Sequence, residues 1–127
     1  MRNFKKFDIW KKGIAIVKET YLLSECLPSK EQFGLQTQLR RAAVSIPSNI
    51  AEGCSRNSDI EFKRYLEIAL GSLFEIETQF IICKELNYIN EKQLHGTFVL
   101  LETEAKMINK LIQTIKKANS QLLKAKS

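Results

Sequence analysis

"SDIEFKRYLEIALGSLFEIETQFIIC", residues 58–83, carries the clearest helical pattern of the sequence. Ser58 is placed to accept a hydrogen bond from the amide of Glu61, and Glu61 is placed to reach back to the amide of Ser58, which is a capping box. Apolar residues then recur at alternating spacings of four and three, which keeps them on one side of an α-helix: Phe62, Leu66, Ala69, Leu73, Ile76, Phe80 and Cys83. The stretch therefore predicts a long amphipathic helix over about 58–86.

Two segments before this helix carry similar patterns. The first covers about 8–27, with Asp8 as its expected capping residue and an expected core line of Trp10, Ile14, Val17 and Tyr21. The second covers about 33–53 and is expected to end at Gly53, because glycine tolerates a left-handed backbone. Its apolar line is Leu35, Leu39, Ala42, Ala43, Ile46 and Ile50.

A fourth helix is predicted over about 90–118. Asn90, with Gln93 three residues later, suits its start, and the tail after about Lys117 is expected to fray. Its apolar line is Leu94, Phe98, Leu101, Ala105, Ile108, Ile112 and Ile115.

Four long helical segments with short connections and almost no strand pattern indicate an all-α fold. We predict an antiparallel up-down-up-down four-helix bundle. The length of 127 residues suits a single domain over 1–127.

The third helix has more apolar residues than one core line needs, which are Ile68, Leu70, Phe74, Ile81 and Ile82. The outer face of a bundle helix is usually polar. Either the core stripe is wide, or this second face is buried against another copy of the chain; we expect self-association.

The net charge of +6 is unevenly distributed. Residues 1–57 carry +5, residues 58–105 carry −5, and residues 106–127 carry six lysines and no acid. Such a division suits a basic surface beside an acidic flank, or complementary faces that meet when copies assemble. A basic protein favours an acidic partner such as nucleic acid.

Little in the sequence points to catalysis. The single histidine, His95, follows Glu91 by four residues and is expected on the surface. Three widely spaced cysteines without a C-x-x-C pair suit a reducing cytoplasm better than a disulfide framework or a zinc site. No phosphate-binding loop, dinucleotide motif or pair of Glu-x-x-His sequences occurs. We expect no enzyme, no cofactor, no metal and no membrane span.

Lysines gather near both ends of the chain, and an up-down bundle would bring the start of the first helix and the end of the fourth together. A positive region of this kind binds phosphate backbones by releasing counterions, although lysines are also ordinary solubilising residues. A membrane surface is a third interpretation, since Phe4 and Phe7 accompany the first lysines. The candidate nucleic-acid or subunit contacts are Arg40, Arg41, Arg56, Lys63, Arg64, Lys11 and Lys12.

"QLRRAAVSIPSNIAEG", residues 38–53, sets a polar strip beside the core line of the second helix. Pro47 cannot donate to the carbonyl of Ala43, so a kink is expected near residues 43–47. The strip holds no pair of nucleophile and base. Arg41 can bind phosphate, pair with Glu31 or Glu52, or meet a carboxylate of an adjacent copy. We assign structural roles in this stretch to Pro47, Asn49, Glu52 and Gly53.

This stretch also resembles the bacterial four-helix-bundle family associated with 23S ribosomal RNA intervening sequences. The resemblance covers "FDIWKKGIAIVKETY" (7–21), "EQFGLQTQLRRAAVSIPSNIAEG" (31–53), "EFKRYLEIALGSLFEIETQ" (61–79) and "LNYI" (86–89). It implies an antiparallel bundle that forms a ring-shaped homopentamer. It also implies a remote relation to the accessory protein of diversity-generating retroelements, which binds reverse transcriptase and nucleic acid.

These observations predict a non-catalytic, cytoplasmic, oligomeric bundle. It is expected to bind RNA or DNA, or to scaffold a nucleic-acid enzyme such as a reverse transcriptase. The alternative is a protein-interaction or structural module without a nucleic-acid ligand.

Overall fold

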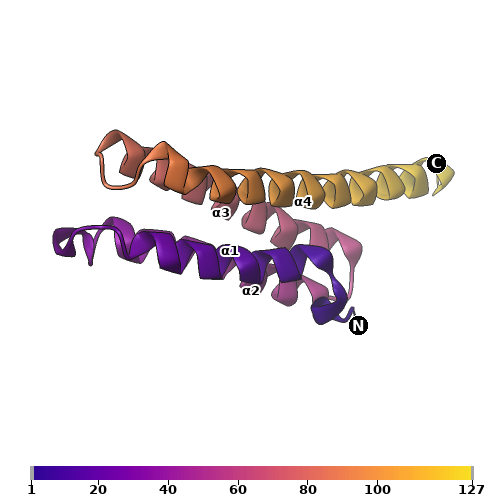
Figure 1. Ribbon diagram of the computed structural model, residues 1–127. Helices are drawn as coiled ribbons and strands as arrows, with labels where there is room; N and C mark the ends of the chain where they lie inside the picture. The colour runs from indigo at the N-terminus through magenta and orange to yellow at the C-terminus, as the bar shows by residue number, and fades with distance from the viewer. Residues whose placement is uncertain (1, 127) are drawn as a thin grey trace.

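The computed structural model describes residues 2–126 and contains four α-helices, with no strand in that range. They are α1 (Asp8–Ser24), α2 (Leu35–Cys54), α3 (Asp59–Glu85) and α4 (Glu91–Lys126). Two short 3-10 turns, η1 (Phe4–Lys6) and η2 (Ser29–Glu31), precede α1 and α2. The helices lie alongside one another, and the last turns of α4 project beyond the rest (Figure 1).

Each helix packs against two others. α2 lies between α1 and α3, and α4 completes the arrangement by packing against both α3 and α1. One core fills the space between them, with Ile16, Ile46, Ile76 and Ile108 among its fully buried side chains. The prediction of an all-α, four-helix fold is confirmed.

α3 follows the sequence prediction closely, whereas the predicted core line of α4 is wrong at Phe98 and Ala105, which are half-buried while Thr97 and Glu104, one residue earlier, are buried. All seven residues of the predicted α3 line are buried. The amide of Glu61 donates to Ser58 Oγ at 3.2 Å, but the Glu61 carboxylate lies 3.5 Å from that hydroxyl instead of bonding the Ser58 amide. At the start of α4 the capping box is complete, since Asn90 and Gln93 exchange two backbone-to-side-chain bonds of 3.0 and 2.8 Å.

The predicted core line of α1 is wrong by one residue. The buried face consists of Ile9, Gly13, Ile16, Thr20 and Ser24, whereas Trp10 and Val17 are half-buried and Ile14 and Tyr21 are exposed. Small residues explain why this face is the buried one, because Gly13 allows α1 to approach α2 closely. A Cβ atom on Gly13 would lie 3.3 Å from Cβ of Pro47.

The expected cap of α1 is also wrong. Phe7 occupies the capping position without a side-chain bond, and Asp8 is the first helical residue. There its carboxylate interacts favourably with the N-terminal end of the helix dipole.

Gly53 does not end α2 as predicted. α2 continues to Cys54, and no glycine in residues 2–126 has a positive φ. Gly53 is buried where α2 meets α3, and a Cβ atom there would lie 2.9 Å from Phe62 Cδ1 and from Tyr65 Cβ. Its role is therefore close packing between helices.

The bounds of α2 and α4 differ from prediction at their other ends. α2 starts at Leu35, and Phe33 is 88% exposed. α4 does not fray after Lys117 but continues to Lys126, because its last residues are mostly good helix formers such as alanine, leucine, lysine and glutamine. α2 passes through Pro47 as a single helix.

The second apolar face of α3 does not join the core. Ile68, Phe74, Ile81 and Ile82 are between 40% and 55% exposed, and Leu70 is half-buried. A wide core stripe within one chain therefore does not explain these residues. Within residues 2–126, no helix has the length and apolar composition needed to cross a bilayer.

Candidate functional site

Arg40 connects α2 to the last turn of α1. Its Nε donates to Ser24 Oγ at 2.9 Å and its Nη2 donates to Glu25 Oε1 at 2.7 Å. The guanidinium also lies over the Tyr21 ring, 4.6 Å from the centroid. Most of its bonding capacity is therefore used within the chain.

Arg41, the neighbouring residue, is exposed and makes no ion pair within residues 2–126. The two partners considered from the sequence are bonded elsewhere. Glu31 accepts from the Leu35 amide at 3.2 Å and from Tyr88 Oη at 3.1 Å, and Glu52 pairs with Arg56. The Arg41 guanidinium is therefore available to a ligand or to another chain.

Arg56 belongs to a cluster at the turn between α2 and α3. It pairs with Glu52, donates to Tyr65 Oη at 2.8 Å and lies over the Tyr65 ring. Its carbonyl accepts from Arg2 Nη1 at 3.0 Å, and Arg2 pairs with Asp59. Sequence reasoning missed Arg2, because its contacts come from residues more than fifty positions away.

The remaining candidate contacts are divided between paired and unpaired side chains. Lys63 pairs with Glu67 at 3.4 Å along α3. Arg64 and Lys11 are exposed and have no ion pair in the part of the chain that the structure describes. Lys12 is half-buried and faces α4. The structure thus does not bring the seven candidates together into one site.

The start of α1 lies beside the middle of α4, and the last turns of α4 project beyond it toward the same end of the molecule (Figure 1). Phe7–Ile9 and Met107, Lys110 and Leu111 line one depression of about 320 Å³. A second depression, of about 290 Å³, joins Ser58–Ile60 to residues of α4 from Ile115 to Leu122. Lysines near both chain ends therefore share one end of the molecule, which we call the basic end: Lys5, Lys6, Lys110, Lys116 and Lys117.

The polar strip of α2 satisfies groups within the chain. The hydroxyl of Ser45, on α2, donates to the hydroxyl of Ser72, on α3, at 2.6 Å. Asn49 Nδ2 donates to the carbonyl of Ser45 at 2.7 Å. This strip therefore forms part of the contact between α2 and α3.

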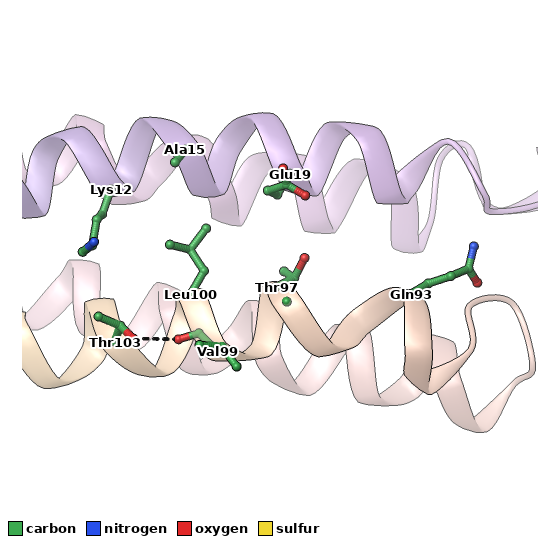
Figure 2. Close-up of a pocket in the computed structure, with 9 residues that line it drawn as sticks. Lys12, Ala15, Glu19, Gln93, Thr97, Val99, Leu100 and Thr103 are labelled. Carbon is green, nitrogen blue, oxygen red and sulfur yellow. Dashed lines mark hydrogen bonds between the residues drawn. The ribbon is translucent and has the colours of Figure 1, made fainter.

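A groove of about 580 Å³ lies between α1 and α4 (Figure 2). Lys12 and Leu100 extend into the space between the two helices. The charged side chains in its lining are Lys12 and Glu19, and its other polar residues are Gln93, Thr97 and Thr103. Among residues 2–126, no group of three or more His, Cys, Asp or Glu side chains could hold a metal ion.

Glu104 is the most unusual ionisable group. Its side chain is fully buried and neither carboxylate oxygen has a hydrogen-bond partner within residues 2–126. Burial raises the pKa of Glu104 to about 8, and the positive charge of Lys12 opposes this effect. The sequence carried a signal, because Thr97, Leu101, Glu104 and Ile108 form a line spaced four, three and four residues apart.

The cysteines are free thiols. Burial raises the pKa of Cys83 to about 11 and also raises that of Cys54. A thiol with a raised pKa is a poor nucleophile at neutral pH, so both residues act as small core side chains. Cys26 is exposed.

Comparison with known proteins identifies the family. The family described as "23S rRNA-intervening sequence protein" matches residues 5–110. The chain belongs to this family. The resemblance to this family that the sequence indicated is therefore confirmed. α4 extends sixteen residues, 111–126, beyond the matched region.

A solved structure shares the fold of this family member. It is a protein of unknown function from the S23 ribosomal protein family of Bacteroides thetaiotaomicron VPI-5482, with a TM-score of 0.76 and 23% sequence identity. The alignment covers 82% of this chain and 97% of that one. A comparison with curated proteins finds no match.

Proposed function

We propose that this protein is a non-catalytic, oligomeric bundle that binds the phosphate backbone of RNA or DNA at its basic end. The observation that supports this function is that the lysine-rich N-terminal residues and the lysine-rich second half of α4 lie toward the same end of the molecule (Figure 1). No acid occurs in residues 106–127. A cluster of this kind attracts phosphates regardless of sequence, because binding releases counterions from the nucleic acid.

The assembly we propose is a ring-shaped homopentamer of antiparallel up-down-up-down bundles. Along α1, residues 7–9 lie beside residues 107–111 of α4, and Lys12 to Glu19 lie beside Thr103 to Gln93, which supports opposite directions for these helices. Five copies, each with a net charge of +6, would strengthen binding to a polyanion, since several weak contacts then act together. The same surface would let the ring hold a nucleic acid beside an enzyme such as a reverse transcriptase.

A cytoplasmic location is part of the proposal. The three free thiols suit a reducing compartment. We propose no catalytic role, because no threonine hydroxyl in the groove between α1 and α4 is hydrogen-bonded to Glu19 within the described residues, and Thr103 Oγ1 donates to the carbonyl of Val99 instead.

The alternative function is a protein-interaction module without a nucleic-acid ligand. The observation that favours it is the engagement of Arg40 and Arg56 in contacts within the chain. Binding measurements separate the two functions.

The experiment is a salt titration of binding to mixed-sequence RNA and DNA of about 30 nucleotides. The test variant replaces Lys110, Lys116 and Lys117 with glutamine. The control replaces Lys30, Lys84 and Lys92, which lie toward the other end, and changes the net charge equally. We expect the test variant to bind at least about tenfold more weakly and to lower the salt slope by about 2 to 3.

We expect the control to change affinity less than twofold. Equal losses in the two variants would show that net charge, and not the basic end, determines binding. No binding of the unmodified protein at low salt would support the protein-interaction function.

A further inference from the structure

Two of the apolar surfaces outside the core lie on α3 and between α1 and α2. The first, which we call the α3 ridge, consists of Ile68, Phe74, Ile81 and Ile82, each 40–55% exposed. The second, the α1–α2 groove, has a volume of about 320 Å³ and lies between the half-exposed lines of the two helices. Its lining residues are Trp10, Ile14, Val17, Val44, Pro47, Ser48 and Ala51.

The rim of the α1–α2 groove is basic. Lys11 and Lys18 lie three residues before and four residues after Ile14, so the three share one face of α1. Arg41 lies three residues before Val44 on α2. All three cations are exposed, and none makes an ion pair within residues 2–126.

Two exposed acids accompany the α3 ridge, and Arg64, four residues before Ile68, is an exposed cation at its N-terminal end. Glu75 lies seven residues after Ile68 and seven before Ile82, so it belongs to the same line on the helix. Glu85 follows Ile81 by four residues. Both carboxylates are exposed and lack an ion pair within the described residues, although Glu75 accepts a bond of 3.2 Å from Gln79.

We propose that the α3 ridge of one copy packs into the α1–α2 groove of the next copy, in a head-to-tail contact. This inference rests on the self-association included in the proposed function. Shape and charge both support it, because a convex apolar ridge accompanied by two exposed acids complements an apolar groove with a basic rim. Every chain carries one surface of each kind, so a second copy supplies the matching partner.

Like charges disfavour two of the symmetric alternatives. If two grooves met about a twofold axis, the basic rims would face each other, and two ridges would likewise bring acids together. When each copy offers its ridge to one neighbour and its groove to another, the contact is heterologous, and such contacts generate rings when the rotation between copies closes. In this contact Arg41 meets a carboxylate beside the α3 ridge of the next copy.

The test uses one charge in each surface. Val44→Glu places a carboxylate in the groove, and Phe74→Glu places one on the ridge. Val99→Glu is the control, because Val99 is 51% exposed on α4 and lies outside both surfaces. Burial of an unpaired charge in an apolar contact is costly, so we expect each test variant to weaken self-association at least about 100-fold in sedimentation equilibrium, while the control assembles normally.

Mixing the two test variants gives the decisive result. The groove variant retains an intact ridge, and the ridge variant retains an intact groove, so an equimolar mixture should form a 1:1 heterodimer that grows no further. Test variants that are monomeric alone and also in the mixture would overturn the head-to-tail contact. Assembly of either test variant with unchanged affinity would overturn it as well, while leaving the proposed oligomer intact.

A strictly monomeric unmodified protein would instead overturn self-association itself. Circular dichroism checks that each variant keeps its helical content. Lys18→Glu and Glu75→Lys, which alter exposed side chains only, provide a second test. Each should assemble more weakly alone, whereas their equimolar mixture pairs opposite charges at both kinds of contact and should assemble beyond the heterodimer. A mixture no larger than either variant alone would overturn the charge pairing of the two surfaces.

Discussion

Glu104 should make the stability of this protein fall as pH rises. In the folded chain the carboxyl is buried without a hydrogen-bond partner in residues 2–126, and its pKa is about 8 instead of the ordinary 4.5. Below pH 4.5 the group is protonated in both states and contributes no pH dependence. Between about pH 4.5 and 8 the unfolded chain loses this proton while the folded chain keeps it, so the unfolded state is favoured progressively.

The magnitude follows from the difference between the two pKa values. One pKa unit corresponds to about 1.4 kcal/mol, so the rise from 4.5 to about 8 makes the loss of stability attributable to Glu104 on the order of 5 kcal/mol, and the loss levels off about one pH unit above the folded pKa. This is a large fraction of the 5–15 kcal/mol that is typical of a folded domain. The positive charge of Lys12 lowers the pKa of Glu104, but this effect is smaller than the rise caused by burial.

Urea unfolding of Glu104→Gln from pH 5 to 9 isolates the effect. The amide keeps the size and polarity of the side chain but cannot ionise, so the variant should gain stability relative to the unmodified protein as pH rises. Glu102→Gln is the matched control, because Glu102 is exposed and pairs with Lys106 on the surface. All proteins must be compared at one concentration, since self-association also changes apparent stability.

The refuting result is specific. If Glu104→Gln and the unmodified protein show parallel stability curves from pH 5 to 9, Glu104 does not keep its proton through folding. Glu104→Met provides a second measurement, because it removes the buried polar group altogether. It should be more stable than the unmodified protein at pH 8.

Further predictions concern packing and the contacts of α2. Gly53→Ala should destabilise by about 1–3 kcal/mol, because the new methyl group meets α3 at 2.9 Å; Gly96→Ala, which faces open space on α4, should instead stabilise by up to about 1 kcal/mol. Thermal unfolding measures both, and equal effects would contradict the packing argument. Arg40→Ala should cost about 1–2 kcal/mol through the loss of its bonds to α1, whereas the exposed Arg64→Ala should change stability by less than about 0.5 kcal/mol. A stability for Arg40→Ala equal to that of Arg64→Ala in urea would show that the contact between α1 and α2 does not depend on Arg40.

The site was less predictable than the helices. The sequence indicated which basic residues are candidate contacts. It could not show that Arg40 is bonded within the chain whereas its neighbour Arg41 is exposed. Arg40 is held by groups from α1, sixteen residues away in the case of Ser24, while Arg41, about 100° further around α2, is exposed. Only the position of one helix beside another could separate them.

The amino-acid sequence by itself determined the four helices, the core line of α3, most of the core lines of α2 and α4, and the caps at Ser58 and Asn90. These features depend on spacing and on contacts within a few residues. The tertiary structure decided what depends on contacts between helices. It selected the Ile9 line over the Trp10 line in α1, because two lines with the same spacing are equivalent until Gly13 meets Pro47. It also buried Glu104 and left the α3 ridge and the α1–α2 groove exposed, because burial depends on where the other helices lie.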